Sequence, residues 1–373
     1  MNSGLTVVIL LSVLILLNVA LKLDRPKTKK RPFICSYAQS PSTDTVHSAN
    51  ETCSTSTNTS SIYFDRIIVV GDVHGDLNGL LEVLFHANLT SSPDSCSWKP
   101  QTSSVLLVQM GDIVDRGPQA TEAWECLSHL QSSASEGGKV VRLIGNHELY
   151  WLQGYVQSRN KSTDSPAKIM SLVRRIKEDI LANKAAGSHL LTLQSGLPLL
   201  FTHAGIRPEF QSYLTSMQVQ SPDQMVEYVN GNLVQAMGSC KVGGKCPLED
   251  EVYQAGDDRG GHHIGGPYWT DFSALEEADN GKSTFPAVQV VGHTMAFCFH
   301  PKRMGYHPRR DELECDQGLI RKTIHMSAIC TDGGMYAGAR AYLEILNGQS
   351  QFIAREKERD GSWSERNLAA GVC

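Results

Sequence analysis

At residues 66–76 the chain reads RIIVVGDVHGD, in which an apolar run is followed at once by Asp72 and His74. Isoleucine and valine are β-branched residues, which are enriched in strands. The glycine after the run has no Cβ, so it allows the sharp turn that a strand end requires. This stretch therefore predicts a buried strand at 66–70 whose carboxyl end presents a carboxylate and an imidazole.

The same arrangement recurs further along the chain. Apolar runs lead into polar motifs in SVLLVQMGDIVDRG (104–117), KVVRLIGNHE (139–148), PLLFTHAGI (198–206) and AVQVVGHT (287–294), and a sixth run, IHMSAIC, lies at 324–330. Amphipathic stretches predict helices over 77–88, 119–133, 166–184 and 222–236. The alternation predicts an α/β domain, in which the carboxyl ends of the strands gather ligand-binding side chains.

The strand ends supply six candidate metal ligands, namely Asp72, His74, Asp112, Asn146, His203 and His293. Carboxylate, imidazole and amide ligands together suit divalent Mn, Fe or Zn, and the lack of a cysteine among them argues against a structural zinc site. Two such ions sharing one carboxylate would activate a bridging water as a hydroxide for direct attack on phosphorus. The set therefore predicts a two-metal hydrolase.

Three neighbouring residues complete the predicted chemistry. His147 follows the ligand Asn146 and could protonate the departing oxygen as a general acid. Asp115 would orient that imidazole and stabilise its cation. Arg116 carries a planar guanidinium that matches phosphate oxygens in a bidentate manner.

The ordered motifs GDVHG, GDIVDRG, GNHE, HAG and GH resemble those of the calcineurin-like metallophosphoesterases, in the phosphoprotein phosphatase branch, over residues 66–340. HAGI at 203–206 is similar to Shewanella-like protein phosphatases and to bacterial diadenosine tetraphosphatases. The resemblance implies a four-layer fold, a central β-sandwich flanked by helices, and two metal ions with manganese favoured. It implies that Asp72, His74 and Asp112 hold one ion.

By the same resemblance the second ion lies among Asp112, Asn146, His203 and His293. Arg116 and Asn146 would contact phosphate, and Arg207 or Arg259 are the candidates for a second arginine contact. The implied substrate is a phosphoprotein, with Ser, Thr or Tyr left open. A diadenosine-tetraphosphatase-like nucleotide hydrolase and a non-catalytic, membrane-anchored binding module are the alternatives.

The sequence also contains the pattern of a different phosphate-binding site, one built on a cysteine nucleophile. Cys315 begins this Cys-x-x-Gly-x-x-Arg pattern, which ends at Arg321. A cysteine nucleophile needs a lowered thiol pKa. The preceding residue is Glu314, whose carboxylate would raise that pKa instead. A loop ahead of the strand at 324–330 is therefore the favoured interpretation of this segment.

The chain divides into four predicted parts. Residues 5–23 are an apolar signal-anchor or signal peptide, because 5–21 carries no charge and approaches the length that spans a bilayer. Residues 24–62 form a linker that is first basic and then rich in Ser and Thr. A catalytic domain follows over 63–360, in which 213–261 is an insertion that could cap the substrate site, and 361–373 is a tail.

Glycan acceptor motifs begin at Asn50, Asn58, Asn88 and Asn160, and the ten cysteines include the close pair Cys240 and Cys246, for which a disulfide is predicted. These features favour a membrane-anchored or secreted body on the lumenal or extracellular side. The basic cluster at 22–32, directly after the apolar run, favours a cytosolic position instead by the positive-inside rule. The net charge is −5, and it is −10 outside residues 22–32, so we do not expect nucleic acid as a partner, since phosphate binding needs a basic face.

Overall fold

The predicted strand at 66–70 lies in the middle of the larger of two sheets. This sheet has seven strands in the order β12-β11-β10-β1-β2-β3-β4. Their bounds are Arg66–Val70 for β1, Val105–Gln109 for β2, Gly138–Leu143 for β3, Ala185–Ala186 for β4, Ala341–Leu346 for β10, Gln351–Lys357 for β11 and Trp363–Asn367 for β12. Strands β1 to β4 are parallel, and β10 pairs with β1 in the antiparallel direction.

The smaller sheet has five strands in the order β5-β6-β7-β9-β8. They span Ser188–Thr192 for β5, Pro198–Thr202 for β6, Val288–Val291 for β7, Arg321–Lys322 for β8 and Ala328–Cys330 for β9. Strands β6, β7 and β9 are mutually parallel. Their carboxyl ends therefore share one edge of the sheet, as the carboxyl ends of β1 to β3 do in the other.

This computed structural model describes residues 63–100, 104–134, 137–156, 164–241, 246–281, 285–295 and 318–368. The predicted signal anchor at 5–23, the linker at 24–62, the acceptors Asn50, Asn58 and Asn160, and Cys315 lie outside these ranges. Among the helices within them, none combines the length and apolar character needed to cross a bilayer.

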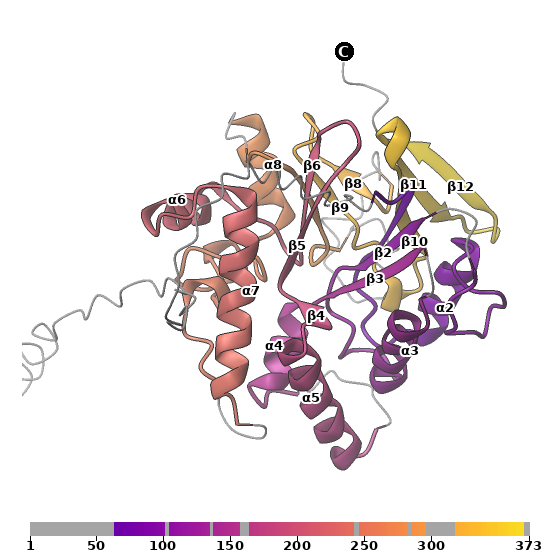
Figure 1. Cartoon of the computed structure of the whole chain (residues 1–373), viewed down its shortest axis with the longest axis horizontal. Helices are drawn as coiled ribbons and strands as arrows, with labels where there is room; N and C mark the ends of the chain where they lie inside the picture. The colour runs from indigo at the N-terminus through magenta and orange to yellow at the C-terminus, as the bar shows by residue number, and fades with distance from the viewer. Residues whose placement is uncertain are drawn as a thin grey trace, which may run out of the picture. The chain divides into compact units, whose positions relative to one another are not determined.

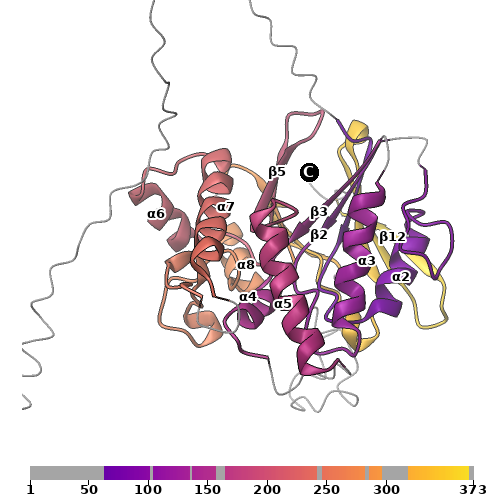
Figure 2. The ribbon, with the colours of Figure 1, turned by 60° about the horizontal axis from the view of Figure 1, so that its bottom comes forward.

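Side chains alternate between two cores along β1, as the period of a strand requires. Ile67 and Val69 face the smaller sheet and pack in one buried cluster with Phe201 of β6. Ile68 and Val70 point the other way, into a cluster that contains the apolar faces of the helices. Those helices are α2 (Leu77–His86), α3 (Ala120–Ser133) and α5 (Pro166–Leu181), and Figure 2 shows α3 and α5 side by side in front of β2 and β3.

Helix α8 (Phe272–Asn280) covers the outer face of the smaller sheet. Its Phe272 and Leu275 pack against Val291 of β7 and Cys330 of β9. The order of layers is thus helices, sheet, sheet and helix. The predicted four-layer α/β fold with a central sandwich is confirmed.

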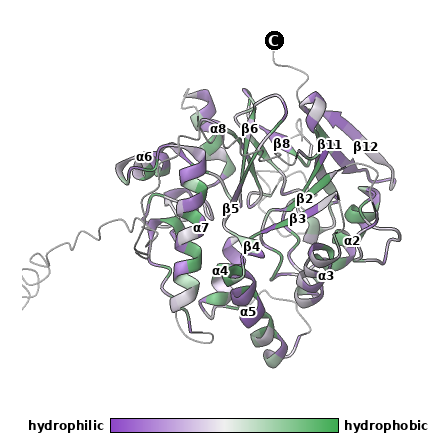
Figure 3. Cartoon of the chain, viewed as in Figure 1, coloured by the Kyte–Doolittle hydropathy of each residue, from purple (hydrophilic) through white to green (hydrophobic). Residues whose placement is uncertain are grey.

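All the strands and helices predicted from apolar runs are present, with ends that differ by a few residues. The C-terminal boundary at 360 is wrong, because β12 at Trp363–Asn367 pairs with β11 along the sheet. Figure 1 shows β11 and β12, in yellow, extending the sheet from the N-terminal strands. Strand β12 is an edge strand of polar residues, coloured purple in Figure 3, so it carries no apolar run that would reveal it.

The predicted insertion at 213–261 contains helix α7 (Pro222–Ser239), preceded by α6 (Pro208–Ser216). Helix α7 packs against α5 and β5. The predicted disulfide between Cys240 and Cys246 is formed, and a second one joins Cys96 to Cys126. The short helix η2 (Asp257–Arg259), near the end of the insertion, reaches the strand ends described below.

One buried carboxylate ties together the loops that follow β2 and β3. Glu148 lies in α4 (Asn146–Leu152), and its side chain is fully buried. Its Oε1 accepts from the amides of Ile113 (2.8 Å) and Val114 (3.0 Å), and its Oε2 from those of Asp112 (2.9 Å) and Gly145 (2.8 Å). A Cβ at Gly145 would lie 2.1 Å from Asp112 Oδ1, so only glycine permits this approach. Glu148 therefore fixes the loop that carries Asp112.

We expect Glu148→Gln to lower the free energy of unfolding by about 2–4 kcal/mol, because the new amide NH₂ would face two backbone donors that are then unsatisfied. Urea denaturation would measure the change. Glu227→Gln, at an exposed position of α7, is the matched control and should stay within about 0.5 kcal/mol of the parent. Equal stability of the two variants would contradict a special role for Glu148.

Candidate active site

The predicted ligands come together between the carboxyl ends of the two sheets. Asp72 and His74 follow β1, Asp112 follows β2 and Asn146 follows β3, while His203 and His293 follow β6 and β7. All are buried except His293, which is half-buried. Hydrogen bonds join the strand ends directly: the amide of His74 donates to Asp112 O (2.8 Å), and the amide of His293 donates to Asp72 Oδ1 (3.0 Å).

The backbone at this site is unusual. Ten non-glycine residues in the described ranges have positive φ, and half of them are predicted site residues, namely His74, Asp112, Asp115, Arg116 and His293. Side chains with a Cβ rarely adopt this conformation, which costs about 1–3 kcal/mol per residue. The tight turns after the strands thus hold these side chains in place against a local backbone preference.

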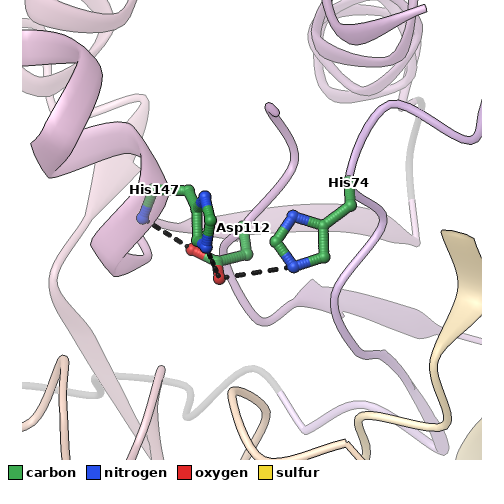
Figure 4. A group of neighbouring side chains, drawn as sticks. All are labelled: His74, Asp112 and His147. Carbon is green, nitrogen blue, oxygen red and sulfur yellow. Dashed lines mark hydrogen bonds and ion pairs between the residues drawn. The ribbon is translucent and has the colours of Figure 1, made fainter. Parts of the chain in front are cut away.

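Backbone carbonyls fix which imidazole nitrogen faces the centre. His74 Nδ1 lies 3.1 Å from Val114 O, and His203 Nδ1 lies 2.8 Å from Met110 O. A carbonyl can only accept, so each Nδ1 carries a hydrogen and each Nε2 faces inward. These Nε2 atoms lie 3.6 and 3.5 Å from Asp112 Oδ2. Figure 4 shows Asp112 between His74 and His147.

Two groups that could hold a cation share Asp112: His74, Asp112 and His147 form one, and Asp112, His203 and His293 form the other. Asn146 Oδ1 lies 2.9 Å from His203 Nε2 and 3.1 Å from His293 Nδ1, and these two nitrogens are 3.2 Å apart.

Buried Asp72 Oδ2 has no hydrogen-bond partner within the described part of the chain. Electron-pair donors that converge in this way, with a buried carboxylate oxygen left over, fit divalent cations.

The pKa shifts at the centre follow from burial and close charges. Burial raises the pKa of Asp72 well above its usual range, and the Asp332 carboxylate adds to this. Burial would also raise the pKa of Asp112, but the His203 and His147 imidazoles outweigh it and hold that pKa well below its usual range. Burial disfavours charge on His203, yet Asp112 raises the pKa of His203 to about 10. The raised pKa favours a protonated His203, so a cation that binds here would compete with that proton.

His147, Asp115 and Arg116 also meet at the centre. His147 Nδ1 donates to Asp115 Oδ2 (2.8 Å), as expected for an imidazole oriented by that carboxylate. Arg116 Nη2 lies 3.3 Å from His147 Nε2, and the Arg116 guanidinium stacks on the Tyr336 ring at 4.8 Å. The arrangement places a proton-carrying group and a phosphate-matching group side by side.

Arg207 is engaged elsewhere. Its guanidinium pairs with Glu209 (2.8 Å) and with Asp257 and Asp258 (3.2 Å each). Arg259, the other candidate for a second phosphate contact, donates to Thr294 Oγ1 (2.8 Å), directly after His293. It also pairs with Asp271 (2.8 Å). Of the two arginines, Arg259 lies beside the loop that carries a predicted ligand.

Four further residues lie at the site to which the sequence assigned no role. Asp332 follows β9 in the stretch TDGG, which repeats the pattern of a strand followed by Asp and Gly, so that pattern could have revealed it. The aromatic residues carry no such local signal. Tyr336 lies edge-on to His74 at 5.1 Å, while Tyr150 packs against His147 at 6.1 Å and against Trp269 at 5.2 Å, and Trp269 lies 5.9 Å from His293.

Curated relatives match parts of the chain. An uncharacterized protein of Schizosaccharomyces pombe is 31% identical over 150 residues, covering 39% of this chain and 45% of that protein. Shewanella-like protein phosphatase 1 of Plasmodium berghei is 38% identical over 91 residues, or 24% of each chain. The symmetrical bis(5′-nucleosyl)-tetraphosphatase of Photorhabdus laumondii is 31% identical over 158 residues, covering 42% of this chain and 50% of that enzyme. The chain thus spans half or less of the length of these relatives.

Solved structures support the fold. A cold-active protein tyrosine phosphatase from a Shewanella species superposes with a TM-score of 0.50 at 20% identity, covering 81% of this chain and 80% of that one. The sequence model of the calcineurin-like phosphoesterases matches residues 65–296, the span that carries all six predicted metal ligands. The chain belongs to the calcineurin-like phosphoesterase family.

Proposed function

We propose that this chain is a phosphoprotein phosphatase that hydrolyses phosphomonoesters with two divalent metal ions. The observation that carries the proposal is that two groups able to hold a cation share Asp112, and that one of them includes His147, which is paired with Asp115. Bound ions of this kind supply Lewis acidity and lower the pKa of a water between them. Manganese is favoured, with iron and zinc as the other candidates.

In this proposal the metal ligands are Asp72, His74, Asp112, Asn146, His203 and His293. Arg116 and Asn146 bind the phosphoryl oxygens, and Arg259 replaces Arg207 as the second arginine contact. Arg116 donates toward His147 Nε2 in the structure. A bound phosphate would draw the guanidinium to its own oxygens, so that His147 Nε2 is left to carry the proton for the departing oxygen. Asp115 stabilises the resulting charge on the imidazole while the proton is held.

The aromatic side chains bear on the choice of substrate. Tyr150, Trp269 and Tyr336 are each partly exposed and surround the metal-ligand cluster on two sides. Planar rings pack well against a planar ring on the substrate, with a gain of about 0.5–1.5 kcal/mol for each pair. We therefore favour phosphotyrosine over phosphoserine or phosphothreonine, in agreement with the name of the Shewanella structure.

A nucleotide substrate is the second candidate, because a base could stack on the same rings and a relative is named as a bis(5′-nucleosyl)-tetraphosphatase. Turnover of a phosphotyrosine peptide, a phosphoserine peptide and diadenosine tetraphosphate by the same preparation separates these possibilities. Hydrolysis of the peptides supports the proposal, and cleavage of the nucleotide alone overturns it.

Two substitutions separate metal binding from proton transfer. Asp112→Asn removes the carboxylate shared by both groups, so we expect bound manganese and activity to be lost together. His147→Asn should keep the metal and reduce kcat by about 10²–10⁴-fold, the usual contribution of a general acid. Elemental analysis of purified protein and steady-state assays measure the two effects. A fully active Asp112→Asn protein would refute the two-metal assignment.

The raised pKa of His203, about 10, predicts how metal affinity depends on pH. Below that pKa the imidazole holds a proton that a cation must displace, so apparent Mn²⁺ affinity should rise about tenfold per pH unit between pH 7 and 9 for release of one proton. Titration calorimetry in buffers with different ionisation enthalpies counts the released protons. Affinity that is constant across this range would show that His203 is not displaced.

Trp269→Leu tests the aromatic contact with substrate. We expect kcat/KM for a phosphotyrosine peptide to fall about 3–10-fold, the loss of one aromatic pair, while kcat/KM for a phosphoserine peptide changes less than about twofold. Trp363→Leu is the matched control, because Trp363 lies in β12 and stacks on His86 of α2. Equal losses on both peptides would assign Trp269 a purely structural role.

A further inference from the structure

Asn88 lies directly after Ala87, the C-cap of helix α2, and buried neighbours on both sides present its side chain to solvent. Asn88 is exposed, whereas Ala87, Leu89 and Thr90 are almost completely buried. The Asn88 backbone has φ +58°, and its amide donates to Phe85 O (2.9 Å), while the amide of Leu89 donates to Leu84 O (2.9 Å). These contacts close the helix and set the direction of the Asn88 side chain.

A second contact fixes the orientation of the Asn88 amide. Lys99 Nζ donates to Asn88 Oδ1 at 2.6 Å. An ammonium group can only donate, so the amide atom that faces Lys99 must be the oxygen. Nδ2 is then the other heavy atom of this exposed amide.

Asn88-Leu89-Thr90 fits the acceptor pattern for N-linked glycans. An attached glycan must extend from Nδ2 into solvent, because a group of that size and polarity has no place in a packed interior. The folded structure meets this requirement, since the acceptor is exposed while the other two residues of the pattern anchor the turn from inside.

A disulfide in the same loop supplies an independent observation about the compartment. Cys96 lies eight residues after Asn88 and is bonded to Cys126 of α3. The bond closes a loop with a sequence separation of 30, which stabilises the fold by restricting the unfolded chain. Disulfides form and persist in oxidising compartments, and Cys240–Cys246 is a second one. Glycan transfer to such acceptors takes place in secreted proteins.

We propose that Asn88 carries an N-linked glycan and that this body folds in the oxidising lumen of the secretory pathway. In the transfer, Asn88 Nδ2 attacks the anomeric carbon of a lipid-linked oligosaccharide pyrophosphate. The carbon–nitrogen bond forms, the carbon–oxygen bond to the pyrophosphate breaks, the lipid pyrophosphate leaves with the electron pair, and Nδ2 loses one proton. Each disulfide forms as two thiols give two electrons and two protons to a disulfide of the thiol-oxidase class.

The position of Asn88 leaves the metal-ligand cluster accessible. Asp76 caps the amino end of α2, two residues after His74, and Asn88 follows the opposite end. A helix of ten residues is about 15 Å long, so a glycan at Asn88 points away from the strand ends. The proposal is independent of the proposed phosphatase activity, which Asn88 substitutions should leave unchanged.

The test uses the full chain expressed in eukaryotic cells. Peptide N-glycosidase converts a glycan-bearing asparagine to aspartate, which peptide mass spectrometry detects at Asn88. We expect Asn88→Gln to increase gel mobility by one glycan, and enzyme treatment to abolish the difference. Asn183→Gln is the matched control, because Asn183 is an exposed residue at the end of α5 with φ +54° but lies outside any acceptor motif.

A second pair of variants, at Thr90, separates loss of the glycan from a folding defect caused by Asn88→Gln. Thr90→Ser keeps the hydroxyl of the acceptor motif and should keep the glycan, whereas Thr90→Val should lose it. Maleimide labelling without reductant should leave Cys96 and Cys126 unmodified. Unmodified Asn88 in a protein that carries glycans at other acceptors would overturn the site, and unmodified Asn88 with both cysteines reactive would overturn the compartment as well.

Discussion

The site depends on one carboxylate that accepts hydrogen bonds from four backbone amides. Glu148 joins the turn after β2 to the turn after β3, and it does so next to Asp112, whose backbone has positive φ. A strained turn persists only when its surroundings determine it from several directions. The four hydrogen bonds supply this constraint from inside the protein, without using any of the side chains that face the cluster. Asp112 can therefore offer both of its oxygens to neighbouring groups.

The buried carboxylates at the site are compensated mostly by groups of the protein itself. Besides Asp115, which is paired with His147, four carboxylates are buried close together, namely Asp72, Asp112, Glu148 and Asp332. This is unfavourable unless each charge is compensated. Glu148 is compensated by amides, Asp332 accepts from the Gly334 amide, and Asp112 is surrounded by imidazoles. Asp72 retains one oxygen without a partner in the described part of the chain. The remaining negative potential is thus concentrated where the proposed cations would bind.

Most of the fold and the candidate metal ligands could be predicted from the sequence, because each predicted ligand lies within a few residues of an apolar run. The local pattern that predicts a strand therefore also predicts where the ligand lies in the fold. Features that depend on long-range packing could not be predicted from a local pattern. Arg207 and Arg259 look equivalent in the sequence, and both pair with carboxylates in the structure. Only the fold places Arg259 beside Thr294, which directly follows His293. Tyr150 and Trp269 are ordinary aromatic residues until the fold places them against each other. Strand β12 was missed because an edge strand can be polar on both faces.

The pairing of β1 with β10 has a consequence for synthesis. Arg66 is opposite Leu346 in this ladder, so the first strand of the domain acquires one of its two neighbours only when almost the whole domain has been made. Until then the nascent chain exposes an apolar strand edge, which is a template for wrong pairing. Such long-range pairing is intrinsically slow to form. The pairing of β1 with β10 is consequently a late step in folding, and the apolar edge of β1 has to be protected from association until β10 has been made.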